Sequence, residues 1–132
     1  MDMDICLICY HDPTSHSFSK VCEIDKVCHF YTKPAAATKY HDQNGILNHV
    51  NNLLNKYKER NWVWTIDGTD FTMKHALEVG TIRKILKLIT KTYNDKLVEI
   101  KVINMNKSME YMYGIIRPFL NKDISKKIKF VS

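Results

Sequence analysis

The residues of this chain with the strongest potential for chemistry are its four cysteines. Cys6 and Cys9 have the C-x-x-C spacing of a zinc ligand pair, and Cys22 and Cys28 follow further along. Zinc is held by four sulfur or nitrogen ligands in a tetrahedron. Cys6 and Cys9 instead lie in an apolar run typical of a buried strand, where their odd separation points them to opposite faces. We therefore expect buried, reduced cysteines and no bound metal. Zinc binding through all four is the minor alternative.

The other patterns with catalytic potential have simpler structural explanations. Asp67 and Asp70 would suit an acid pair or a metal, but they follow an apolar strand, and a turn at its end accounts for them. No base is fixed beside a cysteine thiol, as a nucleophilic Cys/His pair requires. The four glycines are scattered and form no phosphate-binding loop. The sequence therefore predicts a protein that is not an enzyme and holds no cofactor.

The length and the start of the chain set its class. Its 132 residues suffice for one domain, spanning 1–132, around one core. The acidic start, Met1-Asp2-Met3-Asp4, is followed by no long apolar segment, which argues against a signal peptide and a membrane span. We therefore expect a cytoplasmic protein with reduced cysteines.

The positive charge lies in the second half of the chain. Residues 67–132 carry 13 Lys/Arg and 7 Asp/Glu, whereas residues 1–66 carry seven of each. A basic half suits anionic partners such as phospholipid headgroups, but a solvated lysine-rich surface explains it equally well. Trp62 and Trp64 share one strand face and could stack on bases, yet core packing is the better explanation without interleaved arginines. No nucleic-acid partner is predicted.

Apolar periodicity predicts alternating strands and helices. Phe18 to Tyr31 indicates one or two strands with a turn at Asp25-Lys26, and alternation predicts further strands near 62–67, 98–103 and 128–131. Helical spacing predicts helices over 45–60, 72–79 and 82–93, and a last helix that stops near Arg117 because Pro118 follows. We expect Asp42 or Asn44 to cap the first helix, Gly80 to end the second and Thr81 to cap the third. This order predicts an α/β sandwich with a mixed, mostly parallel sheet.

Five segments of the second half carry a family resemblance. They are Trp64 to Phe71, Tyr93-Asn94-Asp95-Lys96, Val102-Ile103-Asn104, Ile116-Arg117-Pro118-Phe119-Leu120 and Lys127-Ile128-Lys129-Phe130. In their order and spacing, over residues 62–131, they resemble the CRAL-TRIO domain of the phosphatidylinositol- and retinal-binding proteins. The resemblance implies a CRAL-TRIO-like sandwich that binds a lipid without catalysis, with phosphoinositide or phospholipid transfer as the specific function of this kind.

The resemblance also implies site residues. Asp95 and Lys127 match the family positions that help to hold an inositol phosphate, although Asp95 is shorter than the family's glutamate and Ile124 replaces a phosphate-contacting threonine. The apolar pocket candidates are Trp64, Ile66, Ile103, Met109, Met112, Ile116 and Phe119.

Without the gating helix of the family, the lipid pocket would need another cover. Family members have a gating helix after the last strand, and this sequence ends at Ser132, where that helix would begin. An uncovered pocket would expose apolar surface, so we expect a cover: a homodimer formed over the helix near 107–117, another protein or a membrane surface. The divergent CRAL-TRIO branch that binds regulatory proteins implies the alternative function, a protein-interaction module.

Overall fold

The computed structural model describes residues 17–36 and 42–131 of the chain. Five strands form one sheet in the order β1-β2-β3-β4-β5. The hairpin β1 (Ser19–Ile24) and β2 (Val27–Thr32) is antiparallel. The strands β3 (Asn61–Asp67), β4 (Leu97–Ile103) and β5 (Ile128–Val131) then add in parallel, each beside its predecessor. The mixed, mostly parallel sheet is therefore as predicted.

Helical segments connect the parallel strands. Before β3 come η1 (Pro34–Ala36) and α2 (Gln43–Lys56). Between β3 and β4 lie α3 (Met73–Ala76), α4 (Val79–Leu88), the π-helical turn η2 (Ile89–Tyr93) and η3 (Asn94–Lys96). Before β5 come α5 (Lys107–Ile116), η4 (Arg117–Phe119) and α6 (Lys122–Lys127).

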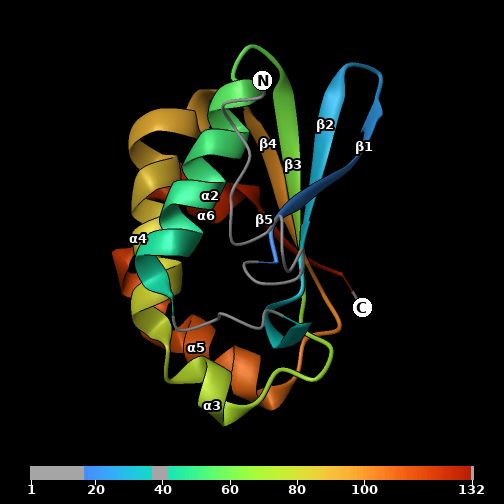
Figure 1. Cartoon of the computed structure of the whole chain (residues 1–132). Coiled ribbons are helices and arrows are strands. Elements are labelled where there is room, and N and C mark those ends of the chain that lie inside the picture. The colour runs from blue at the N-terminus through green and yellow to red at the C-terminus, as the bar shows by residue number, and fades with distance from the viewer. Residues whose placement is uncertain (1–16, 37–41, 132) are drawn as a thin grey trace.

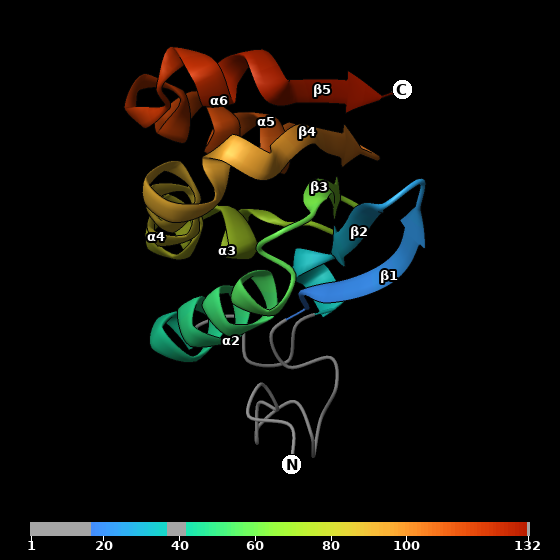
Figure 2. The same ribbon diagram turned by 90° about the horizontal axis from the view of Figure 1, so that it is seen from above.

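The helices gather on one face of the sheet. Figure 1 shows α2, α4, α5 and α6 on one side of the strands, and Figure 2 shows the same layer from above. Each parallel strand is added on the same side of the strand before it. Because crossovers between parallel strands are right-handed, all the connecting helices then lie on one face of the sheet. Among the described residues no helix covers the opposite face. The layer between sheet and helices is therefore where this part of the chain builds its core.

The predicted strands are confirmed in position and type. The segments near 62–67, 98–103 and 128–131 are β3, β4 and β5, and they lie in one sheet. The turn expected at Asp25-Lys26 joins β1 to β2, with both residues at positive φ, 51° and 67°. The side chain of Asp42 caps α2 by accepting a hydrogen bond from Gly45 N at 3.2 Å. Residues 1–16, with the strand expected around Cys6 and Cys9, lie outside the described residues.

The predicted boundary between the second and third helices is wrong. Gly80 does not end a helix and Thr81 does not cap one, because both lie inside the first turn of α4. The helix begins after Glu78, whose carbonyl accepts the backbone N–H of Thr81 at 3.2 Å. Gly80 instead lies against α2, where a Cβ would stand 3.1 Å from the side chain of Gln43. A glycine that permits close helix packing has the same sequence signature as a helix terminator.

Both tryptophans are buried in the core. Trp62 and Trp64 are 3% and 1% exposed, and the indole N–H of Trp62 donates to the Tyr93 carbonyl at 3.1 Å. Phe18 packs edge-on against Trp64 with ring centroids 5.8 Å apart. Core packing of both tryptophans, as predicted, leaves neither ring free to stack on a base. None of the helices in the described segments is long and apolar enough to cross a bilayer.

Candidate functional site

An apolar cavity of about 90 Å³ lies between the sheet and the helices. Its floor comes from the helix-facing side chains of β3, β4 and β5, and its walls come from α4, α5 and the Met105 segment. Among the described residues no charged side chain lines it. The lining residues are Ser17, Thr32, Pro34, Ile46, Trp64, Ile66, Thr81, Ile82, Ile85, Leu86, Ile100, Val102, Met105, Met109, Met112, Tyr113, Ile116, Ile128 and Phe130.

Five of the seven pocket candidates line this cavity, namely Trp64, Ile66, Met109, Met112 and Ile116. Ile103 does not line it. Side chains alternate along a strand, and because Ile100 and Val102 face the cavity, Ile103 points to the other face of the sheet. Phe119 does not line it either, since the chain turns away from the sheet in η4 and leaves this ring 63% exposed.

The α5 wall of the cavity contains flexible side chains. Met105, Met109 and Met112 all face the space, and unbranched thioether side chains adapt to irregular volumes at little cost. Gly68 brings the end of β3 close to this wall, because a Cβ there would stand 2.6 Å from the Asn104 carbonyl and 3.0 Å from Met109 Sδ. The start of α5 is thus held tightly while its cavity-facing side chains can rearrange.

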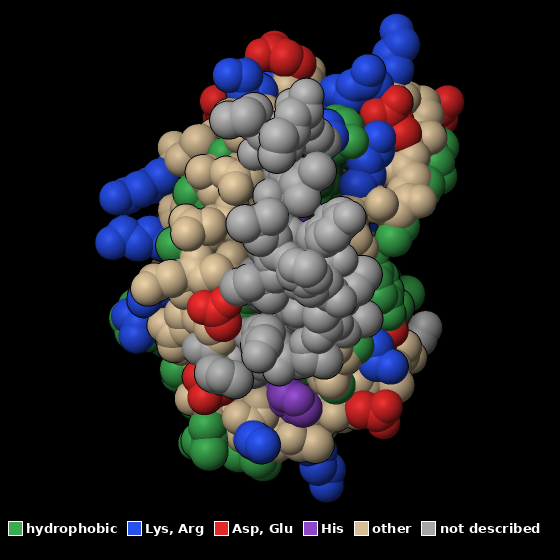
Figure 3. Space-filling view, in the orientation of Figure 1, with side chains coloured by type: hydrophobic (Ala, Val, Ile, Leu, Met, Phe, Trp, Pro, Cys, Tyr) green, Lys and Arg blue, Asp and Glu red, His purple; other side chains and the backbone are tan. Residues whose placement is uncertain are grey.

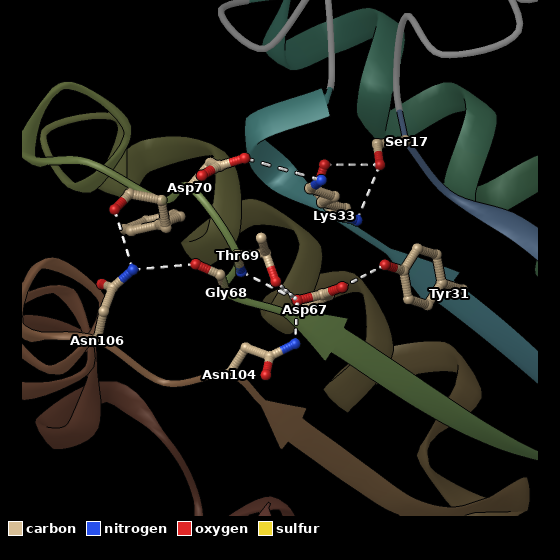
Figure 4. A network of polar contacts seen from close by, with 10 residues as sticks. Ser17, Tyr31, Lys33, Asp67, Gly68, Thr69, Asp70, Asn104 and Asn106 are labelled. Atoms are coloured by element: carbon tan, nitrogen blue, oxygen red, sulfur yellow. Dashed lines mark hydrogen bonds and ion pairs between the residues drawn. The ribbon is translucent and has the colours of Figure 1, made fainter.

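A polar network holds the carboxyl ends of the central strands and the start of α5 together (Figure 4). Asp67 is 8% exposed and accepts hydrogen bonds from Tyr31, from Asn104 at 3.0 Å, and from both the backbone and the side chain of Thr69, at 2.9 and 2.6 Å. Asn106 donates to the Gly68 carbonyl at 3.0 Å and caps α5 by accepting from Met109 N. The network therefore positions one wall of the cavity.

The hydrogen bonds fix the protonation state of the network. Burial alone raises the pKa of Asp67, but the hydrogen bonds from Thr69, Tyr31 and Asn104 outweigh it and hold this pKa well below its ordinary value. The hydrogen bond to Asp67, with burial, raises the pKa of Tyr31 to about 12. Asp67 is thus an ionised carboxylate, and both of its oxygens accept hydrogen bonds. The side chain of Asp70 is 80% exposed and 4.0 Å from Lys33 Nζ, so the two acids form a strand-end turn, as predicted, and no acid pair.

The residues matched to a phosphate site lie at the junction of α6 and η3. Lys127 Nζ donates to the Asn94 backbone oxygen at 2.8 Å and to its side-chain oxygen at 2.9 Å, and lies 3.4 Å from the Asp123 carboxylate. Asp95 follows Asn94 and is exposed. The fold therefore brings Lys127 beside the Asp95 segment. Lys127 also directly precedes Ile128, which lines the cavity.

The described cysteines show no metal or nucleophile geometry. Cys28 is fully buried, and its thiol donates to Glu23 at 3.3 Å. Burial, reinforced by that hydrogen bond, raises the pKa of the Cys28 thiol. Cys22 is exposed on β1, and within residues 17–36 and 42–131 no three His, Cys, Asp or Glu side chains gather as metal ligands. Cys6 and Cys9 lie outside these ranges, so the absence of zinc stays a prediction.

A shallow basic groove runs along the outer face of α4. Arg83, Lys84, Lys87 and Lys91 line it together with the exposed ring of Phe119. The guanidinium of Arg83 lies 4.0 Å above that ring, a cation–π contact. Figure 3 shows Lys and Arg side chains projecting from the edge of the molecule where α4 lies. The basic face expected for this helix is therefore exposed, as its amphipathic pattern indicates.

The sequence did not indicate three cavity residues with hydroxyl side chains, namely Ser17, Thr32 and Thr81. Thr32 Oγ1 accepts the indole N–H of Trp64 at 2.7 Å, and Ser17 exchanges hydrogen bonds with the Lys33 backbone. Thr81 Oγ1 is the buried side-chain oxygen without a partner within the described residues. The apolar helix stripe that contains Ile85 is the signal that could have placed Thr81, since a residue four positions before Ile85 lies on the same side of the helix.

The chain was compared with protein families, curated proteins and solved structures. The family model of the CRAL/TRIO domain matches residues 5–132. Among solved structures, the crystal structure of Sfh5 is similar with a TM-score of 0.74 and 9% sequence identity. The similarity covers 90% of this chain and 48% of that one, so the chain spans about half the length of this relative. Comparison with curated proteins gave no match. The family match extends over nearly all of the sequence, and the chain therefore belongs to the CRAL-TRIO family.

Proposed function

We propose that this chain binds a lipid, without catalysis, in the cavity between the sheet and helices α4 and α5. CRAL-TRIO is a lipid-binding and lipid-transfer family. The observation that carries the proposal for this chain is the cavity lining, which is mainly apolar and has no charged group within residues 17–36 and 42–131. A polar or charged substrate would lose its hydration there without compensation, whereas an aliphatic chain gains from leaving water.

Lipid entry requires the cavity to expand. Its free volume of about 90 Å³ is below the roughly 300–1,000 Å³ that small-molecule pockets offer. The methionine wall supports such an expansion, because Met105, Met109 and Met112 can change rotamer without moving β3 or β4. We infer that an acyl chain enters as the cavity-facing methionines change rotamer and move outward.

Tryptophan fluorescence tests the location of the lipid. Trp64 lines the cavity and Trp62 does not, and the sequence has no other tryptophan. Vesicles with brominated acyl chains should quench the Trp62→Phe protein, which retains Trp64, several times more than the Trp64→Phe protein. Equal quenching in both variants, or none in either, would show that the lipid does not bind in the cavity.

The headgroup proposal concerns Lys127. If the bound lipid carries a phosphate, we expect it at Lys127, beside Asp95, where an ammonium group provides a point charge. Lys127→Ala then removes a charge-assisted hydrogen bond worth roughly 1.5–3 kcal/mol, or about a ten- to hundredfold loss of affinity for anionic phospholipid.

Lys84→Ala is the matched control for Lys127→Ala. Lys84 is exposed on α4, and its loss should weaken only screened, long-range attraction. Both variants should be measured against vesicles containing phosphatidylinositol at near-physiological salt, with unfolding monitored because Lys127 also bonds Asn94. Equal small losses for both variants would mean that Lys127 is an ordinary surface lysine.

The outer face of α5 supports the proposed homodimer. Tyr111 and Ile115 are 52% and 37% exposed there, one helical turn apart. We expect light scattering to detect a dimer that Tyr111→Ser with Ile115→Ser converts to monomer. A wild-type protein that is monomeric at every accessible concentration would contradict the homodimer. Another protein or a membrane would then have to cover this face.

One observation favours the second candidate, a protein-interaction module. The free volume of about 90 Å³ is below the roughly 300–1,000 Å³ of small-molecule pockets, as expected for a core that holds no ligand. On that alternative the purified protein carries no lipid, and its exposed helix faces bind a protein partner. Lipid content therefore separates the two candidate functions.

A further inference from the structure

The hydroxyl of Thr81 is buried in the cavity wall without a hydrogen-bond partner. Thr81 lies in the first turn of α4 and is 4% exposed. Within the described residues its Oγ1 forms no hydrogen bond, although an unpaired buried hydroxyl is unfavourable. Because Thr81 also lines the cavity, this hydroxyl is available to whatever occupies that space.

The serine and the other threonine of the lining are already satisfied within the protein. Thr32 Oγ1 accepts from the indole of Trp64 at 2.7 Å. Ser17 Oγ donates to the Lys33 carbonyl and accepts from the Lys33 N–H, both at 2.9 Å. Thr81 is therefore distinct among the short hydroxyl side chains of this cavity in having its full hydrogen-bonding capacity left over.

A trapped water is a poor partner for Thr81. Buried waters in proteins usually make two to four hydrogen bonds, and apolar cavities without such partners stay dry. The other residues that line the cavity are mostly aliphatic and aromatic, including Ile82, Ile85 and Met109. A ligand that brings both an apolar body and one hydrogen-bonding group satisfies the site better than water does.

We propose that the cavity selects a lipid that places one uncharged hydroxyl or carbonyl group against Thr81. This proposal rests on the proposed lipid-binding function and adds the chemical class of the group that the cavity recognises. The hydroxyl of Thr81 can donate to a carbonyl or exchange hydrogen bonds with an alcohol. An ionised group at this position is unfavourable, because none of the described lining residues carries a charge to pair with it.

A matched pair of probes and variants tests the proposal. 1-Decanol and n-undecane have the same number of heavy atoms and differ in one hydroxyl group. Each is delivered from cyclodextrin, and its affinity is measured by titration against the wild-type chain and Thr81→Val, which removes the hydroxyl and keeps the branched shape. We expect the decanol affinity to fall roughly tenfold in Thr81→Val, and the undecane affinity to stay within about twofold.

Two further variants serve as controls for this experiment. Thr81→Ser, which retains a hydroxyl, should keep the preference for decanol, whereas Thr81→Ala should lose it. Thr65→Val, which removes a hydroxyl from a β3 residue that does not line the cavity, should leave decanol affinity unchanged. The ligand-free Thr81→Val protein should unfold at the same temperature as the wild type or higher, because no hydrogen bond is lost.

The outcomes separate this proposal from the proposed function. If both probes bind and the ratio of their affinities is the same in wild type and Thr81→Val, the cavity binds lipids and the role of Thr81 is overturned. A lower unfolding temperature for ligand-free Thr81→Val would likewise overturn it, since the hydroxyl would then be bonded within the protein. If neither probe binds the wild type, the lipid-binding function itself fails, and the proposal fails with it.

Discussion

A phenylalanine at position 102 is expected to abolish lipid binding. Val102 is 8% exposed on β4 and forms part of the cavity floor. The larger ring would occupy most of a free volume of about 90 Å³ and would block the movement of the methionines opposite. Lipid recovered with Val102→Phe, or taken up from vesicles, should fall at least about tenfold, with a stability loss of roughly 1–3 kcal/mol from overpacking.

Val98→Phe is the control for this experiment. Val98 lies on the same strand but is 51% exposed and does not line the cavity. This variant should bind lipid as the wild type does, so that a loss confined to Val102→Phe identifies cavity volume as the cause. A Val102→Phe protein that is folded, by circular dichroism, and carries the wild-type amount of lipid would show that lipid binds elsewhere.

The second large effect is expected on stability, from Asp67→Ala. The substitution removes an ionised acceptor that serves Tyr31, Thr69 and Asn104. Hydrogen bonds to charged groups contribute about 1.5–3 kcal/mol each, and donors left unpaired add a penalty. Because the bonds form one network and are not additive, we expect the free energy of unfolding to fall by about 3–5 kcal/mol in urea titrations.

Asp70→Ala tests whether the stability loss comes from the Asp67 network or from removing any acidic side chain at this turn. Asp70 is exposed, and within the described residues its ion pair is a long contact of 4.0 Å to Lys33, so its loss should change stability by less than about 1 kcal/mol. Equal effects of the two substitutions would mean that the Asp67 network does not hold the strand ends and α5 together.

The same network predicts a defined pH dependence. Since the pKa of Asp67 is lowered on folding, its stabilisation is complete above the ordinary value of 3.8 and is lost as the pH falls further below it. Since the pKa of Tyr31 is raised to about 12, its stabilisation is present below 10.0 and is lost as the pH rises towards 12. Between these limits the wild-type advantage over Asp67→Ala should be constant, and it should shrink in acid.

The sheet was predictable from local pattern because its strands have strong alternation. In β3 the tryptophans and isoleucine face the helices while Val63 and Thr65 face away, and this period of two survives in the final packing. The start of α4 was not predictable in the same way. Gly80 packs against Gln43 of α2, a contact between distant segments that no local rule contains.

The candidate site was predictable in part. Trp64, Met109, Met112 and Ile116 reach the cavity because they belong to apolar faces that the pattern itself defines. Ile103 was included from motif similarity, although the alternation of β4 places it on the other face. The bonds of Lys127 to Asn94 and the unpaired hydroxyl of Thr81 depend on tertiary contacts, and these arise only when the helices are placed on the sheet.

The lipid content of the purified chain tests the central claim most directly. The protein should be isolated without added detergent, extracted with organic solvent, and its extract quantified by mass spectrometry beside Val102→Phe. We predict close to one lipid molecule per wild-type chain and nearly none for the variant. A wild-type protein that is empty after purification and takes up no lipid from vesicles would contradict lipid binding and favour the protein-interaction function.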